Sequence, residues 1–294
     1  MIRVAVIGVG VMGSAIACRL LATGADVTVF DVDQARRDAL KPRGARAVAS
    51  ARDATNHADY VITSLNTADI VETAVFGASG VAESAVSDRL LVDMSSIDAG
   101  RTAAMAARLA AATGMGWVDA PLSGGAPAAA QGTLTLMVGG SVADVERARP
   151  LLSLLSNNFT RLGGSGAGQT VKLINQILCA SYFMAVTEAV HFAESYGVDA
   201  TAIPAALAGG RGDSRILQEF MAKMARRDFS PTGRIDNMLK DLETVQAAAH
   251  SKHIALPVTS LITDLHRKLV AGGLGAADSA EYIRLFELVG DTTK

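Results

Sequence analysis

The chain has 294 residues, half of them apolar, and a formal net charge of −2. That length can bury a substantial core and predicts two domains. The near-neutral charge and the lack of basic clusters argue against nucleic-acid or membrane-surface binding as the main role. We also expect no apolar stretch long enough to cross a bilayer, and hence no membrane partner.

A dinucleotide-binding pattern opens the chain. A buried-strand pattern over residues 2–7 leads into a glycine-rich turn, and a helix-compatible stretch and a second apolar run then end at Asp31. The residues of the turn are Gly8, Val9, Gly10, Val11, Met12 and Gly13. In such a unit Gly8 permits the tight turn, Gly10 lets backbone amides approach a pyrophosphate, and Gly13 lets the helix pack on the strand.

Asp31 predicts which nicotinamide cofactor is bound. A carboxylate at this position accepts the hydroxyl groups of an adenosine ribose and repels a 2′-phosphate, so we expect NAD rather than NADP. Arg36 and Arg37 begin the next predicted helix and could soften that preference, which leaves NADP possible. A glycine-rich loop that binds nothing would leave Asp31 unexplained.

The same N-terminal stretch also mimics a signal peptide that ends near Cys18. The three glycines inside its apolar region and the single leading positive charge argue against export. Cys18 and Cys179 lie far apart in apolar, helix-like surroundings, and we interpret them as reduced, buried thiols of a cytoplasmic protein. The histidines have no ligand spacing, so we expect no metal site.

The pattern along the chain predicts two different domains. Up to about Leu162, apolar strands alternate with alanine-rich helices, which is typical of parallel βαβ units. The further strands are expected at 60–65, 90–94, 116–120 and 134–138. After the glycine-rich linker 163–168 we expect no strand, but a long apolar helix over 169–196 and shorter helices at 201–208, 215–224, 233–250, 257–271 and 279–288.

The predicted fold is therefore an α/β Rossmann-type domain, residues 1–162, followed by an all-α domain, residues 163–294. The second domain is built around the long helix, which we expect to connect the domains. Apolar residues occupy most faces of that helix, which indicates burial between domains or subunits.

Two segments could carry chemistry. Ser123, Gly124 and Gly125 follow a predicted strand and could present a hydroxyl and two amides to a small anion, although a plain turn would have the same sequence. Lys172 begins the long helix, and Asn175 and Gln176 follow on the same face.

A lysine at position 172 could exchange a proton with a substrate hydroxyl, provided that burial lowers its pKa. The alternative is a lysine whose stem covers apolar surface while its ammonium reaches water. An isolated lysine fits that alternative better, but the nearly uncharged surroundings of Lys172 make a role in function equally consistent with the sequence. The sequence around Lys240 and Asp241, by contrast, predicts a solvated helical face with ion pairs. The tripeptide Arg211-Gly212-Asp213 predicts a polar loop.

Together these segments resemble the β-hydroxyacid dehydrogenase family, which includes 3-hydroxyisobutyrate dehydrogenase and tartronate semialdehyde reductase. The resemblance spans nearly the whole chain. Its most specific parts are the loop 119–125, the segment 132–140 after it, and the segment 166–176 that contains Lys172.

The resemblance implies a role for each matching position. Lys172 matches the catalytic lysine, and Asn175 an amide that contacts the substrate. The positions that match substrate contacts are Ser123, Gly124, Gly125, Gln176, Lys240 and Asp241. The positions that match the nicotinamide end of the cofactor are Leu65, Asn66 and Ser96, with Lys240 closing over cofactor and substrate. The family typically forms dimers or tetramers, so we expect a homodimer or homotetramer.

Positions at which this sequence differs from particular branches of the family bear on which substrate to expect. Gln176 stands where the 3-hydroxyisobutyrate branch usually carries a second Asn, whereas the tartronate semialdehyde branch carries Asn-Gln. Residues 234–236 also resemble that branch. Asn66 replaces a frequent proline, and residues 211–214 match no particular branch. Imine reductases share the fold but usually lack the lysine.

We therefore expect an NAD(P)-dependent oxidoreductase that interconverts a short 3-hydroxy acid and its semialdehyde or keto acid. The leading substrate is 2-hydroxy-3-oxopropionate (tartronate semialdehyde), with 3-hydroxyisobutyrate and L-threonate as alternatives. A non-catalytic, nucleotide-responsive binding protein is the alternative from another class, because the fold alone does not establish activity.

Overall fold

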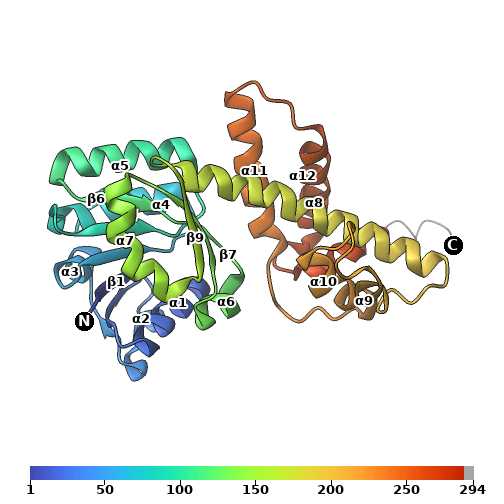
Figure 1. The fold of residues 1–294 in the computed structure, drawn as a ribbon, viewed down its shortest axis with the longest axis horizontal. Helices are drawn as coiled ribbons and strands as arrows, with labels where there is room; N and C mark the ends of the chain where they lie inside the picture. Colours follow the sequence, from blue (N-terminus) through green and yellow to red (C-terminus); the bar gives the residue numbers. More distant parts are fainter. Residues whose placement is uncertain (288–294) are drawn as a thin grey trace. The chain divides into compact units, whose positions relative to one another are not determined.

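The computed structural model describes residues 1–287 (Figure 1). The chain divides into two compact units, Met1–Lys172 and the part from Leu173 onward.

A mixed sheet forms the centre of the first unit. Its strands are β1 (Arg3–Ile7), β2 (Asp26–Phe30), β3 (Arg46–Ala47), β4 (Tyr60–Thr63), β5 (Leu90–Asp93), β6 (Gly116–Asp119), β7 (Leu122–Ser123), β8 (Thr135–Gly139) and β9 (Asn158–Gly163). The strand order is β3-β2-β1-β4-β5-β6-β8-β7, and β9 pairs with β8. The six strands from β3 to β6 are mutually parallel. Their carboxyl ends consequently meet at one edge, where α/β sheets bind ligands.

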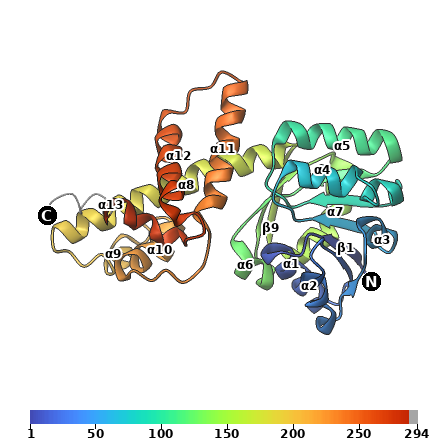
Figure 2. The ribbon, with the colours of Figure 1, turned by 180° about the vertical axis from the view of Figure 1, so that it is seen from behind.

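Helices cover both faces of this sheet (Figures 1 and 2). They are α1 (Val11–Ala22), α2 (Gln34–Asp38), α3 (Ala51–Asn56), α4 (Ala68–Phe76), α5 (Ala99–Thr113), α6 (Gly125–Gln131) and α7 (Val142–Leu155), with short 3-10 turns at Lys41–Arg43 and Val81–Ser84. Alternate residues of β1 enter two separate apolar cores: Val4 and Val6 pack with α1 and α7, whereas Ala5 and Ile7 pack with α3, α4 and α5. Burial on both faces explains the nearly continuous apolar sequence of these strands.

The second unit is helical as far as it is described. Its helices are α8 (Ala167–Ser195, which begins in the first unit), α9 (Ile203–Leu207), α10 (Arg215–Arg226), α11 (Ile235–Ser251), α12 (Pro257–Leu269) and α13 (Arg284–Glu287), with a π turn at Val270–Leu274 and a 3-10 turn at Ser279–Ile283. Helices α11 and α12 form an antiparallel pair (Figure 2). In the core, His266 contacts the Ile262 carbonyl and the Tyr282 hydroxyl, and burial lowers the pKa of its imidazole.

The structure confirms the predicted fold class but corrects some of its elements. Strand β8 runs antiparallel to β6 and β7, so the sheet does not continue as parallel βαβ units. The sequence patterns missed β3, β7 and β9: the first two have only two residues each, and β9 is mostly exposed and has no long apolar run. The last expected helix reaches Glu287, and Leu288 lies outside the described residues.

We expected no apolar stretch long enough to cross a bilayer. Judged only by the length and composition of its helices, the chain contradicts this expectation. Helix α8 is sufficiently long and apolar, with a mean hydropathy of 1.4 and 39% of the relevant window buried. The core helix of a soluble protein passes the same test. Ala180, Phe183, Val186 and Val190 of α8 belong to the buried core of the second unit.

Candidate active site

The glycine-rich turn between β1 and α1 is shaped for close packing on one side and open on the other. Gly8 has a φ of +88°, and a Cβ there would lie 2.5 Å from the Ser64 carbonyl oxygen. A Cβ on Gly13 would collide with the Gly8 carbonyl oxygen. Around Gly10, by contrast, a Cβ would meet only Arg36, at 3.8 Å. Tight packing by Gly8 and Gly13 and open space at Gly10 fit the three roles predicted for these glycines.

The first turn of α1 suits an anion. No side chain caps the N-terminus of this helix, whose first residues are Val11, Met12 and Gly13. Backbone N–H groups at a helix N-terminus, together with the positive end of its dipole, form a phosphate-binding arrangement. The residues present therefore fit the pyrophosphate of a dinucleotide.

Asp31 ends β2 beside this turn. Its carboxylate is buried and accepts hydrogen bonds from the amides of Val9, at 2.8 Å, and Asp33, at 3.0 Å. Each carboxylate oxygen has a second lone pair for a ribose hydroxyl. Arg36 lies 3.9 Å from Asp31 and 3.3 Å from Asp33, so a cation stands at the same edge.

The loops after β4 and β5 hold the residues predicted for the nicotinamide end. Leu65 lies against Gly8, and its amide donates to the Ser95 hydroxyl at 3.0 Å. Asn66 is exposed, and Ser96 is half-buried next to the buried Ser95. The structure thus places these residues at the carboxyl ends of adjacent parallel strands.

Two buried acids, Asp93 and Asp119, lie at this same edge of the sheet. Asp93 ends β5 and accepts hydrogen bonds from the Thr63 hydroxyl and the Ser95 amide. Its Oδ2 has no hydrogen-bond partner among the described residues. Burial raises the pKa of Asp93 to about 6 and is also the main cause that raises the pKa of Asp119. Asp119, at the end of β6, accepts from the amides of Gly166 and Gln169.

The predicted anion loop has an unusual backbone. Gly124 and Gly125 have φ values of +116° and +68°, a region that favours glycine, and Ser123 is half-buried in front of them. Two consecutive residues of this kind turn the chain sharply between β7 and α6. The structure therefore places Ser123 and both glycines in one tight loop, as expected.

Lys172 lies in the second turn of α8 and is only 8% exposed. This burial covers most of the lysine stem, which both an acid–base role and a stem that packs on apolar surface require. Gln169 is three residues before Lys172 and Gln176 four residues after it, and both are also buried. Residues three and four apart share a helix face, so these side chains form one buried polar stripe on α8.

In the second unit, a chain of contacts joins α8 to α11. Asn175 donates to Gln176 Oε1 at 2.8 Å, and Gln176 Nε2 donates to Asp241 Oδ2 at 2.6 Å. Lys240 Nζ lies 3.0 Å from Asp241 Oδ1. The interpretation of Lys240 and Asp241 as a solvated face is wrong for Asp241, which is buried because its carboxylate faces Gln176. The structure thus brings together four of the predicted site residues.

Sequence reasoning missed Asp93, Ser95, Asp119 and Gln169 as parts of the site. A signal was available, because both acids end apolar strands and a buried carboxylate at that position needs partners. Gln169 precedes Lys172 by one helical turn, yet its burial depends on loops from elsewhere in the chain.

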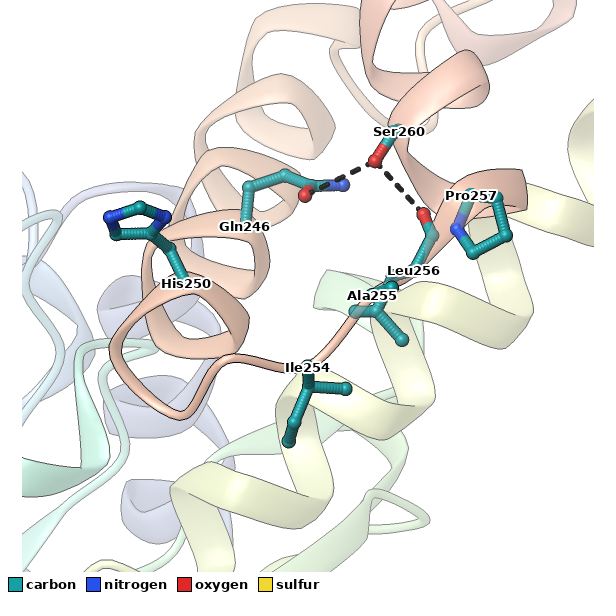
Figure 3. A pocket seen from close by; sticks show the side chains of 7 residues that line it. All are labelled: Gln246, His250, Ile254, Ala255, Leu256, Pro257 and Ser260. Carbon is teal, nitrogen blue, oxygen red and sulfur yellow. Dashed lines mark hydrogen bonds between the residues drawn. The ribbon is translucent and has the colours of Figure 1, made fainter.

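A hollow at the junction of α11 and α12 lies apart from these residues (Figure 3). Its lining includes Gln246, His250 and Ser260, and the Ser260 hydroxyl contacts Gln246 and the Leu256 carbonyl. None of the predicted site residues lines it. Within residues 1–287, no group of three or more metal-ligating side chains could hold an ion.

Comparison with known proteins identifies the family. A family model described as the NAD-binding domain of 6-phosphogluconate dehydrogenase matches residues 3–164. A second, described as the NAD-binding domain of NADP-dependent 3-hydroxyisobutyrate dehydrogenase, matches residues 166–286. The chain belongs to the β-hydroxyacid dehydrogenase family.

Individual relatives agree with this assignment. Escherichia coli 2-hydroxy-3-oxopropionate reductase is 36% identical over 96% of each chain. Eubacterium barkeri 2-(hydroxymethyl)glutarate dehydrogenase is 33% identical over 97% of this chain and 95% of its own. A solved structure of Mycobacterium tuberculosis 3-hydroxyisobutyrate dehydrogenase with L-serine has a TM-score of 0.87 at 28% identity, covering 97% of this chain and 99% of that one.

The protein is therefore an NAD(P)-dependent hydroxyacid dehydrogenase that acts on a CH–OH group. This confirms the predicted enzyme class and excludes the non-catalytic alternative.

Proposed function

We propose that this dehydrogenase interconverts 2-hydroxy-3-oxopropionate and glycerate, with NAD as the preferred cofactor. The observation that carries the proposal is the fixed amide pair of Asn175 and Gln176, held by Asp241. The similarity to the E. coli reductase supports it.

The polar pair favours this substrate over 3-hydroxyisobutyrate. The two substrates differ at C2, which carries a hydroxyl in glycerate and a methyl in 3-hydroxyisobutyrate. Besides the Nδ2 group that donates to Gln176, the Asn175 side chain carries an acceptor, Oδ1, that suits a substrate hydroxyl. A site built to bind a hydroxyl rejects an analogue that lacks it, because its polar groups then lose their partner. L-Threonate also carries a C2 hydroxyl but is one carbon longer, so it remains the second candidate.

The residues divide the work of the reaction. The bound nicotinamide supplies or accepts the hydride. The Ser123 hydroxyl and the amides of Gly124 and Gly125 bind the substrate carboxylate. In the reduction Lys172 donates a proton to the carbonyl oxygen as its negative charge develops, and in the oxidation it takes that proton from the hydroxyl. Asn175, one helical turn further along α8, steadies the same oxygen.

A panel of substrates tests the proposal. Oxidation of glycerate, 3-hydroxyisobutyrate, L-threonate and serine is measured with NAD⁺ and NADP⁺, and reduction of 2-hydroxy-3-oxopropionate with NADH and NADPH. We expect kcat/KM to be highest for the glycerate couple, by at least about tenfold, the effect of one hydrogen bond to a bound hydroxyl. A higher kcat/KM for 3-hydroxyisobutyrate would contradict the proposed substrate.

Lys172→Met tests the acid–base role. We expect kcat to fall by about 10²- to 10⁴-fold, the contribution of a positioned proton donor. NADH affinity, measured by fluorescence, should change little. Lys268→Met, at an exposed lysine of α12, is the control and should retain wild-type turnover. Unchanged turnover in the Lys172 variant would exclude the lysine as the acid–base group.

We further propose a cytoplasmic homodimer or homotetramer. Cys18 and Cys179 are half-buried, so the expectation that both are buried is wrong; the thiol of Cys18 is free, which is usual in a reducing compartment. Support for self-association comes from an exposed apolar face of α8.

A further inference from the structure

Gln169 is the point at which three segments of the first unit are joined. Its side chain is fully buried. Its Nε2 donates to the Ser95 carbonyl at 2.8 Å, and its Oε1 accepts from the Ile97 amide at 3.2 Å. Its own amide donates to Asp119 Oδ2 at 3.2 Å. The first turn of α8 is thereby fixed to the loops after β5 and β6.

Ser95 and Asp93 extend this network to the loop after β4. The Ser95 hydroxyl accepts from the Leu65 amide, and the Ser95 amide donates to Asp93 Oδ1 at 3.0 Å. The same Oδ1 accepts from the Thr63 hydroxyl at 2.9 Å. A continuous buried chain of hydrogen bonds therefore runs from the end of β4 to α8. We call Thr63, Asp93, Ser95 and Gln169 the buried network.

At each of its two ends, the buried network lies next to residues that are assigned to the cofactor or to proton transfer. Leu65 and Ser96 are the residues assigned to the nicotinamide end of the cofactor, and Leu65 is bonded directly to Ser95. Lys172 follows Gln169 by three residues on the same helix face. A helix is stiff over one turn, so a shift of Gln169 moves the Lys172 backbone with it.

We propose that Gln169 is a positioning residue for hydride transfer, holding Lys172 in register with the nicotinamide-side loops through Ser95. This inference rests on the proposed function of Lys172 as the acid–base group. Because Gln169 is fully buried, it acts through Ser95 and the α8 backbone rather than by touching substrate or cofactor.

Gln169→Met tests the inference, because methionine fills a similar volume without hydrogen bonds. We expect kcat to fall by about 10- to 100-fold, as a misplacement of about 1 Å can cost 10²-fold. NADH affinity should stay within about threefold. The primary deuterium isotope effect on kcat should rise, since a misaligned hydride transfer becomes more rate-limiting.

Hydrogen exchange in the protein without cofactor gives a readout independent of activity. The Ile97 amide loses its acceptor in Gln169→Met and should exchange at least about tenfold faster. Ser95→Ala, which removes the acceptor of the Leu65 amide and the side-chain hydrogen bond to Asp93 but keeps the Ser95 carbonyl that accepts from Gln169, is the second variant if Gln169→Met does not fold. It should accelerate exchange at Leu65 and lower kcat in the same way.

Ser156→Ala is the matched control. Ser156 is also buried in the first unit, and its hydroxyl bonds the Leu134 and Asn158 carbonyls, away from the buried network. Its loss should lower the melting temperature while kcat and the isotope effect remain those of the wild type. An equal fall of kcat in this variant would mean that general destabilisation, rather than positioning, explains the Gln169 result.

Two failures can be told apart. A wild-type protein inactive on the whole substrate panel would contradict the proposed function, and the exchange measurement would still decide whether Gln169 holds the loops. A Gln169→Met variant with wild-type kcat, isotope effect and Ile97 exchange would overturn the inference itself.

Discussion

Asp31 supports the glycine-rich turn, and in the proposed function its carboxylate also favours NAD over NADP. Its carboxylate accepts from the Val9 amide, so the negative charge is fixed directly beside the turn. The guanidinium of the nearby Arg36 lies within ion-pair distance of both Asp31 and Asp33. Removing the charge of Asp31 would therefore remove a repulsion of a 2′-phosphate and release a cation that attracts it.

We predict that Asp31→Asn lowers the ratio of kcat/KM with NAD to that with NADP by about 10- to 100-fold, the effect of one charge-assisted hydrogen bond. Asparagine keeps one oxygen acceptor for the turn. Asp38→Asn is the control, because Asp38 is a more exposed acid of α2 that pairs with Lys41 rather than with Arg36. Steady-state kinetics with both cofactors measure the ratio. An unchanged ratio in Asp31→Asn would show that this carboxylate does not set the preference.

At the residue scale, the sequence best predicts the role of a residue whose partners lie close to it in the chain. Gly8, Gly13 and Asp31 act within a single βαβ unit, and their spacing identified them. Asp241 was misread because its burial depends on Gln176, which is 65 positions away. Asp93 and Gln169 were missed for the same reason: their partners come from loops that only the folded sheet brings together.

At the scale of elements, long periodic segments were predictable and short ones were not. The long helix was expected at 169–196 and is found at Ala167–Ser195. Strands β3 and β7 have too few residues for a period, and their neighbours in the sheet determine them. Strand β8 pairs antiparallel with β7 although α6 lies between the two strands in the chain, and no apolar pattern records that direction.

The pairing of α8 with α11 leads to a prediction about stability. Asp241→Ala would leave the buried Gln176 amide without its carboxylate acceptor. We expect the free energy of unfolding to fall by about 2 kcal/mol, typical of a lost hydrogen bond to a charged group. Urea unfolding followed by far-UV circular dichroism measures it.

Glu243→Ala, two positions further along α11, provides the comparison. Its carboxylate pairs with Arg267 at 2.8 Å, but both side chains are about half exposed. Exposed ion pairs contribute little because water and salt screen them, so this change should stay within about 0.5 kcal/mol. Equal effects of the two substitutions would mean that Asp241 does not hold α8 against α11.

At the scale of the whole molecule, one face of α8 is apolar yet exposed in the single chain. Ile174, Leu178, Tyr182 and Phe192 are each between 44% and 64% exposed. At about 100° per residue they fall within roughly 80° of the helix circumference. Ala185 and Ala189 lie within the same arc. Large contiguous apolar patches on soluble proteins mark interaction sites, and we call this one the α8 stripe.

We predict that the α8 stripe is covered by a second copy of the chain. A symmetric pair would bury the same stripe from both copies, which is how most homodimers associate. The double substitution Leu178→Glu and Tyr182→Glu would place like charges opposite one another in such an interface. Light scattering coupled to size-exclusion chromatography should then report a lower mass than for the wild type, a dimer becoming a monomer or a tetramer becoming a smaller species.

Val142→Glu is the control for added charge, since Val142 is 62% exposed at the start of α7 in the first unit and is not part of the stripe. This variant should keep the wild-type mass. A wild-type protein that runs as a monomer, or a double variant that still assembles fully, would show that the stripe is not the interface. A solvent-exposed stripe of this composition should then also lower solubility, because no described segment of the second unit covers these side chains.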